Sequence, residues 1–199
     1  MRLPNSPLAA FLLLWALSCA SAANAGSGEP GWTLELMMNQ LQQIGERSAR
    51  FTETREPALL EQPIEQTGTL SFQPPDRLIR TLSPPSDSRY EIEGNRLTLW
   101  QGGRQQQTLL LDNLPGLLAF SASFRSVLAG DLETLQSYFV TRLSGDESAW
   151  KLTLTPKQSG LARQIARIDI DGRRQEIDRY TVVETSGDQT ITHLTPVRE

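Results

Sequence analysis

The chain has 199 residues, of which 38% are hydrophobic and 21% charged, and its formal net charge is −4 at pH 7. A chain of this length is suited to one domain with a substantial core. The acidic balance argues against nucleic acid, which favours basic patches, and against electrostatic docking on an anionic membrane.

The N-terminal 25 residues have the pattern of a secretory signal. Arg2 precedes an apolar run over residues 8–17, and small residues follow up to Ala23-Asn24-Ala25. A charged start, an apolar middle and an A-x-A end are typical of a cleavable signal, and the run is shorter than the ~20 residues of a membrane-spanning helix. We therefore expect cleavage near Ala25 and a mature protein that works outside the cytoplasm.

The only cysteine, Cys19, lies inside this signal. The mature domain would then contain no disulfide, no thiolate nucleophile and no cysteine-ligated metal. An alternative stays open, because Ser18-Cys19 fits the step at which a bacterial lipoprotein is cleaved and lipidated. The preceding Ala16-Leu17 matches that signal poorly.

Residues 26–31 are rich in glycine, serine and proline and predict a mobile leader, which leaves 32–199 as the folded domain. From Trp32 the apolar residues recur every three or four positions, which predicts one amphipathic helix that ends near Gly45. The apolar positions of this helix are Leu34, Met37, Met38, Leu41 and Ile44.

A series of short strands follows this helix. Pro74-Pro75 and Pro84-Pro85 interrupt the series, and Gly94-Asn95 is a hairpin signal. Turn signals at intervals of about eight to twelve residues indicate an antiparallel meander. The predicted strands are 49–54, 64–72, 77–82, 89–93, 96–100 and 106–111.

The segment 114–139 has a helical pattern, with Pro115 suited to a first turn and Gly130-Asp131 to a stop and a new N-cap. The remainder returns to strands, and Asp171-Gly172 predicts a hairpin turn. These strands are 140–143, 150–155, 165–170, 176–184 and 190–194. The order of elements predicts an α+β fold with a large curved antiparallel sheet.

Residues typical of catalysis are nearly absent from the sequence. His193 is the sole histidine, and no G-x-S-x-G motif or glycine-rich phosphate loop occurs. The carboxylates Asp169 and Asp171 lie beside the expected turn, where aspartate is common because its side chain hydrogen-bonds the turn backbone, so we do not read them as a catalytic pair. We expect a protein that is not an enzyme and that uses no metal and no cofactor.

The apolar segment 114–139 is the obvious cover for one face of the sheet, which must be packed against something. A cover that stays in place makes this face an ordinary core. A cover that lifts makes the face a pocket for an acyl or polyene chain, since burial of each methylene is favourable by ~0.8 kcal/mol. The sequence leaves both interpretations open.

Several segments, in this order, resemble the LolA-type periplasmic lipoprotein carriers and their outer-membrane relative LolB. The similarity covers nearly all of the mature chain. The segments are 49–53, 68–72 with 75–78, the hairpin 90–100, 150–157, and the hairpin 168–178. The resemblance implies an unclosed antiparallel half β-barrel, covered by the N-terminal helix and a helical lid insert.

The resemblance also implies a function. It predicts a periplasmic monomer that shields lipid or lipoprotein acyl chains and shuttles them from an inner-membrane donor to an outer-membrane acceptor, without nucleic acid. A LolB-like acceptor lipidated at Cys19 is one alternative. The segment 124–131 is more similar to a divergent LolA-like branch found beside aryl-polyene gene clusters, so a polyene lipid is a second alternative cargo.

Candidate site residues fall into three groups. Family carriers place a latching arginine where this chain has Pro74, so Arg77 or Arg80 is the candidate latch. The lid candidates are Leu117, Leu118, Phe120, Phe124, Val127 and Leu128. The pocket candidates are Phe51, Leu70, Phe72, Leu78, Tyr90, Ile92, Leu97, Leu99 and Trp100.

Overall fold

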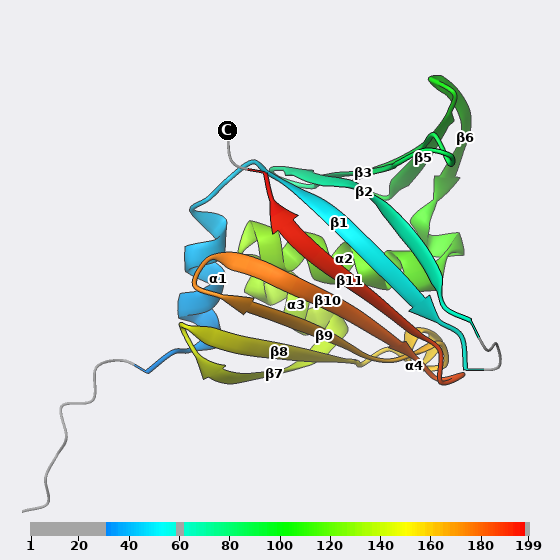
Figure 1. Cartoon of the computed structure of the whole chain (residues 1–199). Helices are drawn as coiled ribbons and strands as arrows, with labels where there is room; N and C mark the ends of the chain where they lie inside the picture. The colour runs from blue at the N-terminus through cyan, green and yellow to red at the C-terminus, as the bar shows by residue number, and fades with distance from the viewer. Residues whose placement is uncertain (1–30, 59–61, 198–199) are drawn as a thin grey trace, which may run out of the picture.

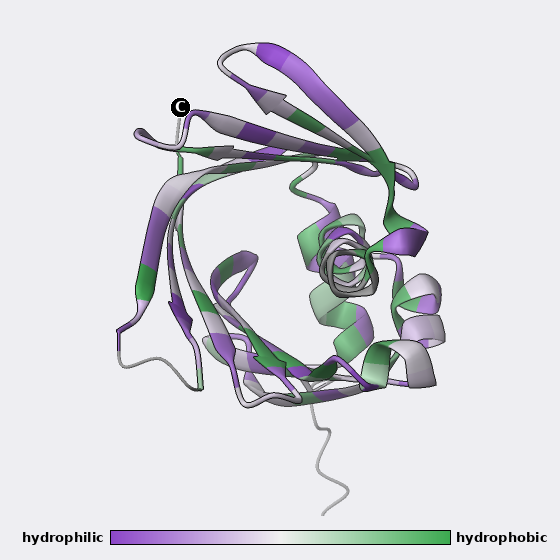
Figure 2. Ribbon diagram, turned by 90° about the vertical axis from the view of Figure 1, so that its right-hand side faces the viewer, coloured by the Kyte–Doolittle hydropathy of each residue, from purple (hydrophilic) through white to green (hydrophobic). Residues whose placement is uncertain are grey.

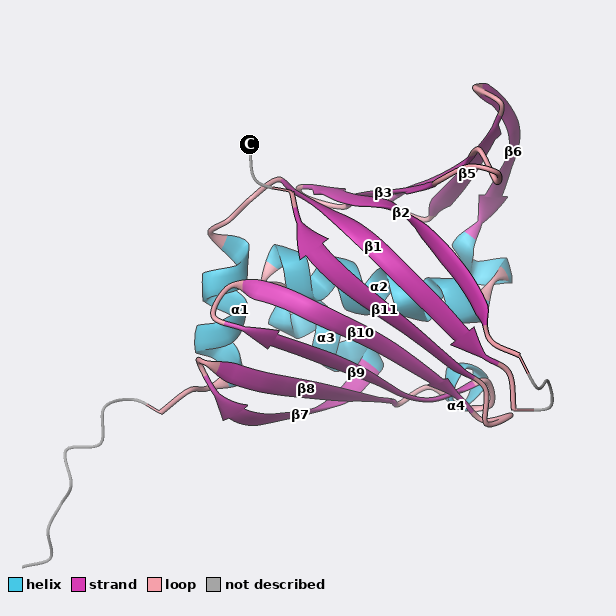
Figure 3. Cartoon of the chain, in the orientation of Figure 1, coloured by secondary structure: helices cyan, strands magenta, loops and turns pink. Residues whose placement is uncertain are grey.

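A computed structural model describes residues 31–58 and 62–197. These residues form a single antiparallel sheet of eleven strands that curves around the helices and does not close (Figures 1 and 3). The first six strands are β1 (Arg47–Glu56), β2 (Ile64–Gln73), β3 (Arg77–Leu82), β4 (Ser88–Glu93), β5 (Arg96–Gln101) and β6 (Arg104–Leu110). The others are β7 (Phe139–Asp146), β8 (Ala149–Pro156), β9 (Ile165–Arg173), β10 (Glu176–Glu184) and β11 (Gln189–Pro196).

Two meanders make up the sheet. Strands β1 to β6 neighbour one another in chain order, as do β7 to β11, and the pairing of β1 with β11 joins the two halves. Strands β6 and β7 are therefore the two free edges. The α+β half-barrel expected from the sequence is confirmed.

The helical segment 111–138 connects these free edges across the concave side of the sheet. In Figure 2 the longest helix is seen end-on inside the curve of the strands. The helices are α1 (Leu34–Gln42), the 3₁₀ turn η1 (Leu111–Asn113), α2 (Pro115–Ala129), α3 (Leu132–Tyr138) and α4 (Ser159–Ala162). Within the described residues, none of them has the length and apolar character needed to cross a bilayer.

The helix ends follow local sequence signals. The Thr33 side chain accepts a hydrogen bond from the Leu36 amide at 3.2 Å and begins α1. Gly130 adopts a left-handed conformation with φ of 68° and ends α2, and the Asp131 carboxylate caps α3 through the Thr134 amide at 2.9 Å. The predicted stop and new cap at Gly130-Asp131 are thus confirmed.

The expected hairpin turn at Asp171-Gly172 is wrong. Strand β9 continues through Gly172 to Arg173, and the chain turns at Arg174, whose φ is 51°. A Cβ on Gly172 would lie 2.7 Å from the Trp150 Cη2 atom. This glycine therefore makes room for the Trp150 indole rather than forming a turn.

Candidate functional site

Strand alternation places every second residue of the sheet on its concave face, toward the helices. The register aligns Leu78 of β3 with Ile92 of β4, and Ile92 with Leu97 of β5. In the other half, Tyr180 of β10 is opposite Thr192 of β11. Residues far apart in the sequence therefore share one curved, largely apolar surface.

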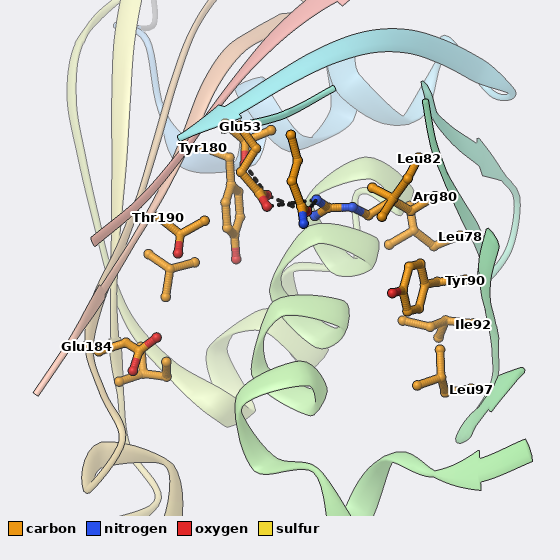
Figure 4. Close-up of a pocket in the computed structure, with 14 residues that line it drawn as sticks. Glu53, Leu78, Arg80, Leu82, Tyr90, Ile92, Leu97, Tyr180, Glu184 and Thr190 are labelled. Carbon is orange, nitrogen blue, oxygen red and sulfur yellow. Dashed lines mark hydrogen bonds and ion pairs between the residues drawn. The ribbon is translucent and has the colours of Figure 1, made fainter. Parts of the chain in front are cut away.

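A cavity of about 400 Å³, here called cavity 1, is hollowed into this surface above α2 (Figure 4). Its volume lies within the range typical of small-molecule sites. The apolar walls come from β3–β5 on one side and from β9 and β10 on the other. They consist of Leu78, Leu82, Tyr90, Ile92, Leu97, Ile165, Tyr180 and Val182.

The polar part of cavity 1 is held by one ion pair. The Glu53 carboxylate accepts hydrogen bonds from both terminal nitrogens of Arg80, at 2.8 and 2.7 Å, and from the Thr192 hydroxyl at 2.9 Å. The Glu53 and Arg80 side chains are only 14% and 23% exposed. Because removal of one partner would leave a poorly solvated charge, this pair fixes β1, β3 and β11 relative to one another.

Tyr180, on the wall of cavity 1, belongs to a cluster of three aromatic side chains that line a small gap next to it. The Arg80 guanidinium lies 4.4 Å from the centroid of the Phe51 ring. Phe124 of α2 meets Tyr180 edge-on at a centroid distance of 5.4 Å. We call Phe51, Phe124 and Tyr180 the aromatic layer.

A second cavity of about 240 Å³, cavity 2, lies on the far side of this layer, near the start of β1 and the C-terminal end of α2. Its apolar lining includes Leu70, Phe72, Phe124, Leu128, Ile177 and Leu194. Arg47 lies on its wall and donates hydrogen bonds to the carbonyl oxygens of Leu41 and Leu128. Desolvation by burial lowers the pKa of Arg47 to about 10.

Helix α2 is fastened to the sheet by polar contacts as well as by packing. The Arg125 guanidinium donates to the carbonyl oxygens of Asp76 at 3.2 Å and Gly94 at 2.8 Å, which belong to the β2–β3 and β4–β5 turns. Burial lowers the pKa of Arg125. The Ser123 hydroxyl lies 3.0 Å from that of Tyr180, and burial raises the pKa of this tyrosine.

Residues 22–197 match a family model described as outer membrane lipoprotein carrier protein LolA-like. The chain belongs to this LolA-like family. Members of the family are carriers or binding proteins of lipids or lipoproteins. Among curated proteins, none matches the chain in sequence.

Solved structures with a related fold share little sequence with this LolA-like chain. A LolA superfamily protein of Nitrosomonas europaea is 10% identical, with a TM-score of 0.46 over 84% of this chain and 94% of its own. The lipoprotein LppX of Mycobacterium tuberculosis is 9% identical, with a TM-score of 0.39 over 83% and 97%. In the MucA/MucB complex of Pseudomonas aeruginosa, the matching chain is 14% identical, with a TM-score of 0.44 over 83% and 57%.

Most pocket candidates of this LolA-like chain lie on the concave face. Leu78, Tyr90, Ile92 and Leu97 line cavity 1, Leu70 and Phe72 line cavity 2, and Phe51 lies between the cavities. Leu99 is half-buried against the core beside Tyr90. Trp100 is among the lining residues of neither cavity; it follows Leu99 and pairs with Arg89, so strand alternation places it on the opposite face from Leu99 and Tyr90.

The lid candidates occupy α2. Phe124, Val127 and Leu128 are buried, and Leu118 is half-buried against the core. The side chains of Leu117 and Phe120 lie outside the described part of the structure.

The two candidate latches do not hold α2 through any hydrogen bond that the described residues record. Arg77 pairs with Glu91 at 2.7 Å and with Gln73 at 2.8 Å, and Arg80 pairs with Glu53. Two other arginines bond this helix to the sheet: Arg125, on α2 itself, and Arg47 of β1, which donates to the Leu128 carbonyl oxygen. His193 is exposed on β11, and no group of three or more potential metal ligands occurs among the described residues.

The sequence predictions did not name the polar half of the site or the wall formed by β10. Glu53 and Thr192 come together only because β1 pairs with β11, which is a contact between opposite ends of the domain. The alternation of Tyr180, Val182 and Glu184 along β10 was a usable signal for the second wall.

Proposed function

We propose that this protein is a periplasmic carrier that holds a hydrocarbon chain of a lipid or an acylated lipoprotein in cavity 1. In this proposal it takes its cargo from an inner-membrane donor and shuttles it toward an outer-membrane acceptor. The observation that carries the proposal is the apolar cavity of about 400 Å³ between the two half-sheets. Export with cleavage near Ala25 is part of the same proposal.

The composition of cavity 1 supports an amphipathic cargo. The wall formed by β3–β5 is mainly aliphatic, whereas Gln66, Glu184 and Thr190 add polar groups. A hydrocarbon chain on the aliphatic wall gains ~0.8 kcal/mol per buried methylene, and its polar end can hydrogen-bond at the polar side. Non-covalent binding of this kind is reversible, as a carrier requires.

Uptake of a fluorescent fatty acid by the purified protein tests this proposal. Val182 lines cavity 1, and a Val182→Trp substitution should fill part of the cavity and lower the affinity at least tenfold. Val183 follows it on the opposite face of β10, so Val183→Trp is a matched control that should bind like the wild type. Equal binding by the two variants, or no binding by the wild type, would overturn the proposal.

Native mass spectrometry of protein released gently from the periplasm addresses the cargo and the N-terminus together. A bound lipid or acylated protein is expected, on a chain that begins near Gly26. A polyene lipid as the bound species would select that alternative cargo. A chain that retains an acylated Cys19 would place the protein on the membrane instead and contradict the soluble carrier.

A further inference from the structure

Cavities 1 and 2 lie in series on the concave face. A gap of about 10 Å³ between them is lined by Phe51, Leu70, Arg80, Phe124, Tyr180, Thr192 and Leu194. Arg80, Tyr180 and Thr192 also line cavity 1, whereas Leu70, Phe124 and Leu194 also line cavity 2. The aromatic layer therefore packs between the two cavities, together with Leu70, Arg80, Thr192 and Leu194.

We propose that one hydrocarbon chain crosses the aromatic layer, with one part in cavity 1 and its end in cavity 2. The protein would then select long unbranched chains over short ones. This inference rests on the proposed function, because it assumes that the chain first occupies cavity 1. Continuity with cavity 1 identifies the occupant of cavity 2 as the distal part of the same chain.

The aromatic layer can yield without disturbing the sheet. Its rings make the following contacts through rotatable side chains: Phe124 meets Tyr180 edge-on, the Phe51 ring lies beneath Arg80, and the Tyr180 hydroxyl lies 3.0 Å from the Ser123 hydroxyl of α2. None of these contacts includes a backbone hydrogen bond of the β ladder. The gap of about 10 Å³ has room for no more than one water molecule, so a chain that crosses the layer must turn its rings aside.

Cavity 2 offers an apolar side to the end of a chain, beside a polar side made of Glu46, Arg47, Ser48, Gln175 and Glu176. Apolar side chains line it next to the aromatic layer, and its arginine already donates to the carbonyl oxygens of two helix ends. Burial of methylenes against Leu70, Phe72 and Ile177 would add affinity without a new polar contact.

The inference is tested by competition of unbranched fatty acids, from octanoate to stearate, against a fluorescent fatty acid. In the wild type each added methylene should tighten binding by up to about fourfold, beyond the length that fills cavity 1. Leu194→Trp should block the passage, so its affinities should match the wild type for short chains and stop rising for long ones. Thr195→Trp, on the exposed face of the same strand, is the matched control.

The outcomes separate the inference from the proposed function. Affinities that stop rising at the same chain length in the wild type and in Leu194→Trp would overturn the inference alone. Failure of every fatty acid to bind the wild type would overturn the proposed function.

A measurement on the wild type avoids dependence on how Leu194→Trp folds. Decanoate and palmitate that carry a photoreactive diazirine at the chain end can be crosslinked and the labelled peptides sequenced. Palmitate should label the start of β10 or the end of α2, around Ile177 and Leu128, whereas decanoate should label the wall of cavity 1 around Leu97. Labelling of the cavity 1 wall by both probes would contradict the inference.

Discussion

At the scale of single residues, Gly68 determines how the Phe51 ring lies in the aromatic layer. A Cβ at this position of β2 would collide with the Thr81 carbonyl oxygen and lie 2.8 Å from the Phe51 Cε1 atom. Both contacts are tighter than van der Waals packing allows, so the strand or the ring must move. The absence of a side chain at Gly68 therefore positions the ring on which Arg80 stacks.

Gly68→Ala should lower the free energy of unfolding by about 1–3 kcal/mol, the usual cost of overpacking. Urea denaturation followed by circular dichroism measures this change. Gly160→Ala is the control, because nothing lies within 4 Å of its Cβ position and α4 tolerates alanine. A Gly68→Ala protein as stable as the wild type would show that the Phe51 ring is not fixed by this contact.

The sequence could predict which single residues share a face wherever the strand pattern is regular. Leu78, Tyr90 and Ile92 were named as pocket candidates from the strand segments without an assigned face, and the structure has them in one cavity wall. Leu99 and Trp100 were both named as pocket candidates, although consecutive strand residues point to opposite faces and only Leu99 shares the face of Tyr90. Gly172 was misread because a close approach of Trp150 and a turn both favour glycine.

At the scale of elements, α2 is the cover of the concave face, and Arg125 is the side chain that fastens it to two turns of the sheet. Its hydrogen bonds reach carbonyl oxygens of Asp76 and Gly94, and no carboxylate forms an ion pair with it among the described residues. Its Nε atom is buried without a hydrogen-bond partner. The contact is therefore specific in geometry but modest in net free energy, because part of the gain is offset by desolvation.

Arg125→Met should lower the free energy of local opening of α2 by about 1 kcal/mol, because methionine keeps an apolar stem and lacks the charged donors. Amide hydrogen exchange in residues 121–129 should accelerate about fivefold, whereas exchange in β8 and β9 should stay unchanged. Arg104→Met, on the exposed edge strand β6, is a control that removes the same charge. Unchanged exchange in α2 would show that the Arg125 hydrogen bonds are not needed to hold the cover.

The strands and the main helices followed from sequence patterns in the correct order, but α4 and the attachment of α2 to the sheet did not. Apolar spacing predicted a helical segment after Leu114, and Gly130-Asp131 divided it at the correct place. The family resemblance placed the candidate latch on β3, at Arg77 or Arg80. A bond from a helix side chain to turn carbonyls depends on tertiary placement, which local patterns do not encode.

At the scale of the whole molecule, one strand pair makes a cavity out of two meanders. The β1–β11 pairing spans the domain from Ala49↔Pro196 to Glu56↔Gln189, and cavity 1 lies astride it. The ion pair of Glu53 with Arg80, joined by Thr192, crosses the same seam. The sequence predicts each meander through local turns, whereas the pairing of the first and last strands is a long-range contact that leaves no local signal.

Because the cavity exists only when both halves are assembled, a bound chain should stabilise the folded protein as a unit. A ligand that binds the folded state alone adds about 2.7 kcal/mol when its free concentration is a hundred times its dissociation constant. For a domain of this size each kcal/mol raises Tm by about 2–4 °C, so saturating fatty acid should raise the Tm of the wild type by about 5–10 °C in calorimetry. Val182→Trp should show no such rise at the same concentration, and Val183→Trp should show all of it. A rise in Tm of equal size in both variants would mean that the fatty acid stabilises the protein from outside cavity 1. A rise that is lost only in Val182→Trp would identify the closed seam between the two half-sheets as the binding unit.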